Sequence, residues 1–124
     1  MEGITKKILI VDDDPDIRRF LEFNLKKKGF EISQASNGAK ALEILKDQIP
    51  DLIITDMMMP ILDGYGLLEA LKKNPELSHI PVIMLTGEDD KEASERTIQA
   101  DARTRKPFST ADILAKIEKL LLKT

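Results

Sequence analysis

Apolar and polar residues follow two different periods along the 124-residue chain. Short runs rich in β-branched and other aliphatic residues predict β-strands at 7–11, 31–35, 52–55, 81–85 and about 102–105. Between them, apolar residues recur at helical spacing and predict α-helices near 15–28, 38–48, 64–73, 90–99 and 110–122. Because strands and helices alternate strictly, we expect an α/β protein with a parallel sheet made of repeated βα units.

Residues that favour helix ends stand at these predicted boundaries. A side chain that can accept a hydrogen bond from the first helical turn precedes each predicted helix, at Asp14, Asn37, Asp63, Asp89 and Ser109. Pro15 follows Asp14 at a first helical position, and Gly29 follows the first helix as a stop signal. We therefore interpret Asp14 and Asp63 as helix caps and not as ligands.

The polarity of the strands predicts their order in the sheet. The first, third and fourth strands are continuously apolar, as expected for strands that helices cover on both faces. The segments 31–35 and 102–105 are half polar and therefore belong at the edges. With right-handed crossovers, the simplest arrangement is a doubly wound five-stranded parallel sheet of order 2-1-3-4-5, whose direction of winding reverses between strands one and three.

Length and composition narrow the class of protein further. A chain of this length fits a single domain over residues 1–124, and its net charge of -3 does not suggest direct nucleic-acid binding. The absence of cysteine excludes disulfides and thiolate metal sites. The first seven residues lack the order of a signal peptide, and the apolar runs are too short to cross a bilayer. We expect a cytoplasmic protein with no membrane association.

Acidic residues end two of the strands that are predicted to be neighbours. Asp12, Asp13 and Asp14 follow the first strand, and Asp56 follows the third. These carboxylates should leave the same edge of the sheet at its switch point, where open α/β sheets bind ligands. Because clustered like charges disfavour ionisation, the group needs a cationic partner. Oxygen ligands without histidine or cysteine favour magnesium or calcium over zinc.

A hydroxyl and an ammonium group join this edge. Thr86 follows the fourth strand and Lys106 follows the fifth. A carboxylate nucleophile, a bridging metal, a lysine and a hydroxyl together suit the transfer of a phosphoryl group.

The segments around these residues resemble a known family. Its motifs match, in order, at 8–15, 50–60, 63–64, 80–87 and 106–108. Each segment alone is weakly specific, but the full set in this order and spacing closely resembles the receiver domain of two-component response regulators. The resemblance covers essentially the whole chain and implies a flavodoxin-like (βα)5 fold.

The resemblance also implies a role for each residue of the set. Asp56 would be the phosphoacceptor, which takes a phosphoryl group from a histidine kinase phosphohistidine or a small acyl phosphate. Asp13 would bind Mg²⁺ directly, Asp12 through water or by orienting it, and the backbone carbonyl of Met57 would be a further ligand. Thr86 would bond a phosphoryl oxygen. Lys106 would pair with the phosphate. The peptide bond between Lys106 and Pro107 would be cis.

The implied function is a signalling switch and not an enzyme with an external substrate. The domain would catalyse only its own Mg²⁺-dependent phosphorylation and dephosphorylation. Its partners would be a histidine kinase or phosphotransfer protein and a downstream effector or an absent output domain. The chain is compatible with a free-standing receiver, a phosphorelay shuttle or a piece of a transcription factor.

Three rival interpretations are disfavoured by particular residues. A haloacid dehalogenase-type phosphohydrolase would have threonine or valine at position 16, where this chain has Asp16. A Ca²⁺ loop beginning at Asp12 would require glycine where Ile17 stands. A non-phosphorylatable module on the same fold is disfavoured because Asp13, Asp56, Thr86 and Lys106 are all retained.

The chain departs from the family near its end. Gln99-Ala100-Asp101 replaces the common Gly-Ala-Asp, and Arg103 stands where the family has an aromatic residue. An unpaired arginine cannot enter an apolar slot without a large penalty. We therefore expect Arg103 to face solvent or to pair with the acidic residues between 88 and 92, which would make the output sensitive to salt.

Overall fold

The sheet forms in the predicted order. The computed structural model describes residues 5–86 and 100–121 and contains a five-stranded parallel sheet of order β2-β1-β3-β4-β5. Its strands are β1 (Lys7–Val11), β2 (Glu31–Ala35), β3 (Leu52–Asp56), β4 (Val82–Thr86) and β5 (Ala102–Arg105). The described helices are α1 (Pro15–Lys26), α2 (Gly38–Leu45), α3 (Gly64–Lys73) and α5 (Thr110–Leu121). The helix predicted at 90–99 and its cap Asp89 lie outside the described residues.

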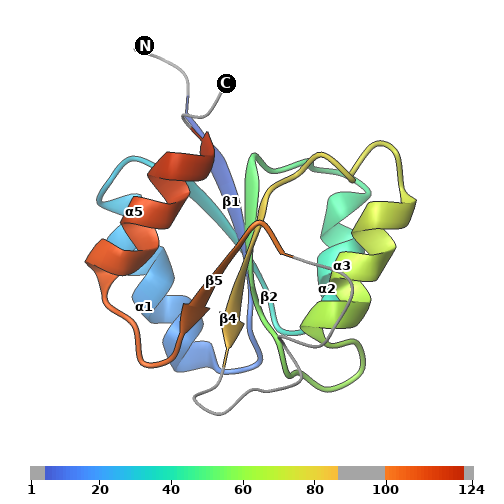
Figure 1. Cartoon of the computed structure of the whole chain (residues 1–124), viewed down its shortest axis with the longest axis horizontal. Coiled ribbons are helices and arrows are strands. Elements are labelled where there is room, and N and C mark those ends of the chain that lie inside the picture. Colours follow the sequence, from blue (N-terminus) through green and yellow to red (C-terminus); the bar gives the residue numbers. More distant parts are fainter. Residues whose placement is uncertain (1–4, 87–99, 122–124) are drawn as a thin grey trace.

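Helices cover the sheet on both faces (Figure 1), with α1 and α5 on one side and α2 and α3 on the other. Successive residues of a strand point to opposite faces, so each central strand contributes to two cores. Ile8 and Ile10 of β1 pack in the layer of α1 and α5, whereas Leu9 and Val11 pack in the layer of α2 and α3. This two-sided burial explains why the central strands are continuously apolar.

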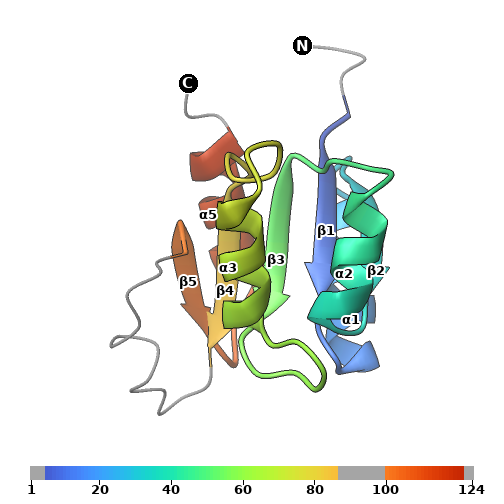
Figure 2. The ribbon, with the colours of Figure 1, turned by 90° about the vertical axis from the view of Figure 1, so that its right-hand side faces the viewer.

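The edge strands are the two half-polar ones, as predicted. All residues of β3 and β4 are buried, whereas β2 buries only Ala35 and β5 buries only Thr104. Figure 2 shows the strand arrowheads directed to one edge of the sheet. Side chains that follow the strands therefore gather there.

Polar side chains cap the described helices as predicted. Asp14 accepts a hydrogen bond from Asp16 N, Asn37 from Lys40 N, Asp63 from Gly66 N, and Ser109 from Asp112 N. The first two helices end earlier than predicted, at Lys26 and Leu45 instead of residues 28 and 48.

Local turns explain the early helix ends. After α1, the N–H groups of Gly29 and Phe30 bond to the carbonyls of Lys26 and Leu25, while Gly29 takes a φ of 97° that glycine adopts without strain. After α2, the N–H groups of Asp47 and Gln48 both bond to Ile44 O. The last helical carbonyls are therefore satisfied by turns rather than by further helix.

The start of α3 lies directly against the end of β3. A Cβ atom built on Gly64 would come within 2.4 Å of the Asp56 carbonyl oxygen, closer than a side-chain carbon can approach. The same glycine donates its N–H to Met57 O at 2.8 Å. Gly64 therefore allows α3 to hold the backbone that follows Asp56. Within residues 5–86 and 100–121, helices of the length and hydropathy needed to cross a bilayer do not occur.

Candidate functional site

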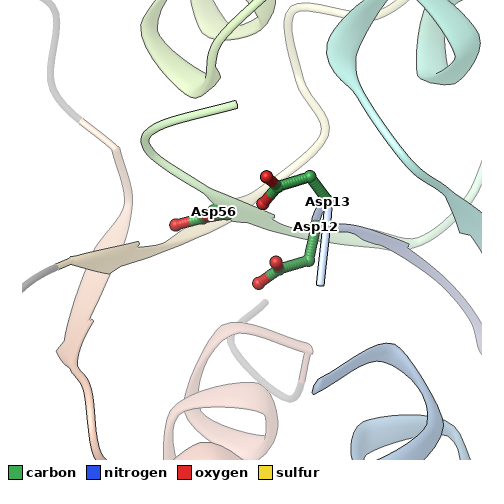
Figure 3. Close-up of side chains that lie close together, drawn as sticks. All are labelled: Asp12, Asp13 and Asp56. Atoms are coloured by element: carbon green, nitrogen blue, oxygen red, sulfur yellow. The ribbon is translucent and has the colours of Figure 1, made fainter. Parts of the chain in front are cut away.

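Three carboxylates meet where β1 and β3 end. Val11 pairs with Thr55 in the parallel register, so the following residues Asp12 and Asp56 lie side by side at the sheet edge. One oxygen from each of Asp12, Asp13 and Asp56 lies within 4.8 Å of the others. Figure 3 shows the carboxylates of Asp12 and Asp13 directed toward the side on which Asp56 lies. The structure thus brings together the acidic residues that the sequence placed at the switch point.

These carboxylates differ in their access to solvent. Asp12 is fully buried, Asp56 is 8% exposed and Asp13 is exposed. Asp12 Oδ1 accepts a hydrogen bond from Asp14 N at 2.9 Å, and Asp56 Oδ1 accepts one from Met57 N at 2.8 Å. Backbone donors therefore fix the two buried carboxylates.

Lys106 supplies a positive charge to this acidic group. Its Nζ lies 3.2 Å from Asp56 Oδ1 and 3.4 Å from Asp12 Oδ2, with the side chain 28% exposed. The Lys106 N–H donates to Thr86 O at 2.8 Å, and the Lys106–Pro107 bond is cis, as the resemblance implied. The Lys106 ammonium group thus reaches the ends of β1 and β3 from the segment that follows β5.

Burial and neighbouring charges shift the pKa values of Asp12, Asp56 and Lys106. Desolvation raises the pKa of Asp12 and of Asp56 above the ordinary aspartate value. The main opposing effect is the hydrogen bond from Asp14 N for Asp12 and the ion pair with Lys106 for Asp56, and neither offsets the burial. Burial acts to lower the pKa of the Lys106 ammonium, but the charges and hydrogen bonds of Asp12 and Asp56 outweigh burial and raise that pKa. The site therefore holds Lys106 as a cation and carries carboxylates that gain from a further positive charge.

A divalent cation that prefers oxygen ligands fits these three carboxylates. Because Asp13 is exposed, a divalent cation held by the three carboxylates would stay accessible to water. Magnesium usually keeps several water ligands when it binds to proteins. The residues of the cluster offer neither imidazole nor thiolate, so zinc is a poor match.

The main-chain carbonyl that follows Asp56 takes part in a hydrogen bond to the start of α3. The Met57 carbonyl, expected as a metal ligand, accepts the hydrogen bond from Gly64 N at 2.8 Å, and Met57 is buried. The next residue, Met58, is 59% exposed. Met59 is half-buried against the core. Of these three methionines, Met58 is therefore the most exposed, and the Met57 carbonyl is the one that Gly64 engages.

Thr86 ends β4, next to the strand that carries Asp56. It is buried, and its hydroxyl donates to Thr104 O at 3.5 Å, at the outer limit of hydrogen bonding. So long a bond is weak, and a stronger acceptor can readily replace Thr104 O.

Arg103 is half-buried on β5. The acidic residues between 88 and 92, its expected partners, lie outside the described residues.

The sequence reasoning missed Arg18 as a neighbour of the site. Its guanidinium group donates to the main-chain carbonyl of Asp12 at 2.5 Å. The signal available in the sequence was Gln34, a polar residue inside a predicted strand, whose amide needs a hydrogen-bond partner in the folded protein.

The order of the sheet and the acidic cluster at its switch point define a flavodoxin-like α/β domain with a candidate phosphoryl-transfer site. Residues 8–118 match the family model of the response regulator receiver domain. The chain therefore belongs to the receiver domain family of two-component response regulators, whose general role is to accept a phosphoryl group in signalling.

Individual relatives agree with this family. The probable transcriptional regulator ycf27 of Porphyra purpurea is 44% identical over 123 residues, which cover 98% of this chain and 49% of that protein. This chain thus spans about half the length of the curated relatives it matches. The signal receiver domain of a signal transduction histidine kinase from Syntrophus aciditrophicus is 36% identical, with a TM-score of 0.91 over 95% of this chain and 91% of that one.

A more distant structure has the same fold. The receiver domain of a sensor histidine kinase from Pseudomonas aeruginosa was solved with a magnesium ion coordinated in its active site cleft. It is 23% identical to this chain, with a TM-score of 0.89 over 97% of this chain and 100% of that one.

Proposed function

We propose that Asp56 is the phosphoacceptor of this receiver domain. The observation that carries the proposal is the position of its carboxylate at the end of a central strand, 3.2 Å from the Lys106 ammonium and within a cluster of three carboxylates. The donor is the phosphohistidine of a histidine kinase or phosphotransfer protein, or a small acyl phosphate. The phosphorylated site then alters a surface that a downstream effector or output domain reads.

The proposed transfer uses the second carboxylate oxygen of Asp56, Oδ2. Oδ1 is engaged by Met57 N and Lys106, so Oδ2 attacks phosphorus. The new P–O bond forms as the P–N bond to the donor imidazole, or the P–O bond of an acyl phosphate, breaks, and the leaving group takes that electron pair. Lys106 stabilises negative charge on a transferred oxygen, and the Thr86 hydroxyl leaves Thr104 O to bond another.

The acidic residues would hold Mg²⁺ for this step. Asp13, which is exposed, would be a direct ligand together with Asp56, and buried Asp12 would act through water or by orienting the others. When bound, Mg²⁺ neutralises phosphoryl oxygens and lets an anionic donor approach three carboxylates. The Met57 carbonyl would have to share its oxygen with Gly64 N–H, so Met58 O is the better candidate for a main-chain ligand.

Selective labelling can distinguish the two carbonyls. In a protein labelled only with ¹³C-carbonyl, ¹⁵N-methionine, an HNCO spectrum contains two peaks, because Met57-Met58 and Met58-Met59 are the only Met-Met pairs in the sequence. Addition of Mg²⁺ should shift the Met58 carbonyl more than the Met57 carbonyl. A dominant shift of the Met57 carbonyl would restore Met57 as the ligand.

An apolar surface beside the site supports docking of a donor protein. Ile17 and Phe20 of α1 line a groove of about 520 Å³ with Lys106, Pro107 and Phe108. The rings of Phe20 and Phe108 lie 6.2 Å apart, and Phe20 is 43% exposed. An apolar face next to the acceptor would bind a helix of the donor while placing its phosphohistidine over Asp56.

Comparing a protein phosphodonor with a small one distinguishes an effect on docking from an effect on the chemical step. Phe20→Ala should slow phosphotransfer from a phosphotransfer protein that labels the wild type, while the rate with acetyl phosphate stays unchanged. Phe23→Ala, an exposed phenylalanine of α1 outside the groove, is the control. Equal effects on both donors would contradict the docking role of Phe20.

The acceptor chemistry is tested with acetyl phosphate. Intact mass spectrometry should show one added phosphoryl group in the presence of Mg²⁺ and almost none in EDTA. Asp56→Asn should abolish labelling, whereas Asp47→Asn, an exposed aspartate away from the site, should not change it. Full labelling of Asp56→Asn would refute the proposal.

A further inference from the structure

A side-chain network of α1 and β2 reaches the turn that carries the acidic cluster. Arg18, which is half-buried, donates from Nη1 to Asp12 O at 2.5 Å and from Nε to Gln34 Oε1 at 3.0 Å. Gln34 in turn donates from Nε2 to Glu22 Oε1 at 2.8 Å, and Glu22 Oε2 lies 3.1 Å from Lys26 Nζ. The guanidinium group is thus held from two sides.

The hydrogen bond from Arg18 to Asp12 O lies where the backbone leaves the sheet. Asp12 follows the last residue of β1, and its N–H still pairs with Ala35 O at 3.1 Å. Its carbonyl receives the charge-assisted bond from Arg18, while its carboxylate receives the N–H of Asp14. Arg18 therefore restrains the peptide group between the two residues that carry the first two carboxylates of the cluster.

The neighbouring arginine makes no such contact. Arg19 pairs with Asp16 at the surface, and both of these side chains are largely exposed. Arg18 and Arg19 therefore carry the same charge on the same helix, but only Arg18 reaches the backbone of the cluster.

We propose that Arg18, held by Gln34, is a positioning residue that fixes the Asp12–Asp13 turn and thereby sets the affinity of the acidic cluster for a divalent cation. Arg18 itself touches no reacting atom. The inference rests on the proposed Mg²⁺ site and adds the residues that hold the ligands in place. Outer partners of this kind contribute to metal affinity by restricting the orientation of the ligands.

Lysine at position 18 tests the geometry of the guanidinium group. Arginine is a planar fork that can bond to Asp12 O and Gln34 together, whereas an ammonium group is a single point. Arg18→Lys should therefore recover only part of the function lost in Arg18→Ala.

The experiment is a Mg²⁺ titration of the unphosphorylated domain, followed by the ¹⁵N-amide shifts of Asp13 and Met57. Arg18→Ala should raise the Kd by on the order of tenfold. Arg19→Ala, which removes the same charge, should change it by less than about twofold, because a distant exposed charge is screened. Gln34→Ala should give an intermediate Kd, and the double variant Arg18→Ala with Gln34→Ala should be no weaker than Arg18→Ala.

Stability is measured in parallel so that a structural effect is recognised. Ile117→Val, a conservative change in the core under α5, should lower the melting temperature without changing the Kd. If Arg18→Ala does not fold, Gln34→Ala and Arg18→Lys provide the same test.

The outcomes separate this inference from the proposed function. Equal Kd values for Arg18→Ala and Arg19→Ala, or wild-type affinity in Gln34→Ala and Arg18→Lys, would overturn the positioning role while leaving the Mg²⁺ site intact. Failure of the wild type to bind Mg²⁺ at Asp13 would instead overturn the proposed site itself.

Discussion

Single residues near the site show how a receiver domain accommodates polar groups inside an apolar sheet. Thr55 and Thr104 are both buried threonines on strands. The Thr55 hydroxyl donates to Asp56 O at 2.9 Å, whereas the Thr104 hydroxyl has no hydrogen-bond partner among the described residues. The buried threonine hydroxyl on β3 is therefore compensated by a hydrogen bond. The one on β5 lowers the stability of the fold, because its loss of water is not compensated within the described residues.

Replacement of each threonine by the isosteric valine should have opposite effects. Thr104→Val removes a hydroxyl that has no hydrogen-bond partner within residues 5–86 and 100–121 and should stabilise the protein by about 1 kcal/mol. Thr55→Val removes a hydrogen bond beside the acceptor and should destabilise it by about 1 kcal/mol. Urea denaturation of both variants measures the difference, and a destabilised Thr104→Val would show that its hydroxyl has a partner in solution.

At the scale of elements, the sequence predicted the sheet because its strands differ in kind. A strand that is apolar at every position is covered by helices on both faces, as at Ile8–Val11. A half-polar strand has only one covered face or lies at an edge, as at Glu31–Ala35. The order of the strands and the meeting of Asp12, Asp13 and Asp56 followed from that difference.

Other features depend on contacts between elements and could not be predicted from local pattern. The bond from Arg18 to Asp12 O requires the helix and the turn to be placed first. The engagement of the Met57 carbonyl likewise depends on the approach of α3 through Gly64. The helix ends were predicted too late, because the local polarity of 27–28 and 46–48 does not distinguish a last helical turn from the turn that follows it.

The junction of β3 and α3 should tolerate no side chain at Gly64. A Cβ there would meet backbone at the Asp56 carbonyl, so Gly64→Ala should destabilise the domain by about 1–3 kcal/mol. Gly66→Ala is the control on the same helix, because its Cβ would meet the end of the flexible Leu62 side chain. Thermal unfolding should show a much larger loss for Gly64→Ala, and equal losses would contradict this account of the junction.

At the scale of the whole molecule, the acidic cluster should make the metal-free protein less stable as pH rises. The folded-state pKa values of Asp12 and Asp56 lie above the ordinary 3.8. Between 3.8 and those raised values the folded protein binds more protons than the unfolded chain, so stability falls with increasing pH. The raised pKa of Lys106 adds a second loss above its ordinary value of 10.5.

Neutralising one carboxylate isolates this effect. In EDTA, Asp56→Asn should be more stable than the wild type at pH 7, and the difference should shrink as pH falls toward 3.8. Asp47→Asn should show no comparable pH-dependent gain, since that side chain is exposed. A gain for Asp56→Asn that is constant with pH would contradict the electrostatic explanation.

Chemical trapping of the phosphorylated protein shows directly whether Asp56 receives the phosphoryl group. After reaction with acetyl phosphate and Mg²⁺, borohydride reduces an aspartyl phosphate to homoserine, which peptide mass spectrometry assigns to one residue. Homoserine should be found at position 56 alone, and only when Mg²⁺ is present during the reaction. Homoserine at Asp12 or Asp13, with position 56 unchanged, would contradict the proposal that Asp56 is the phosphoacceptor.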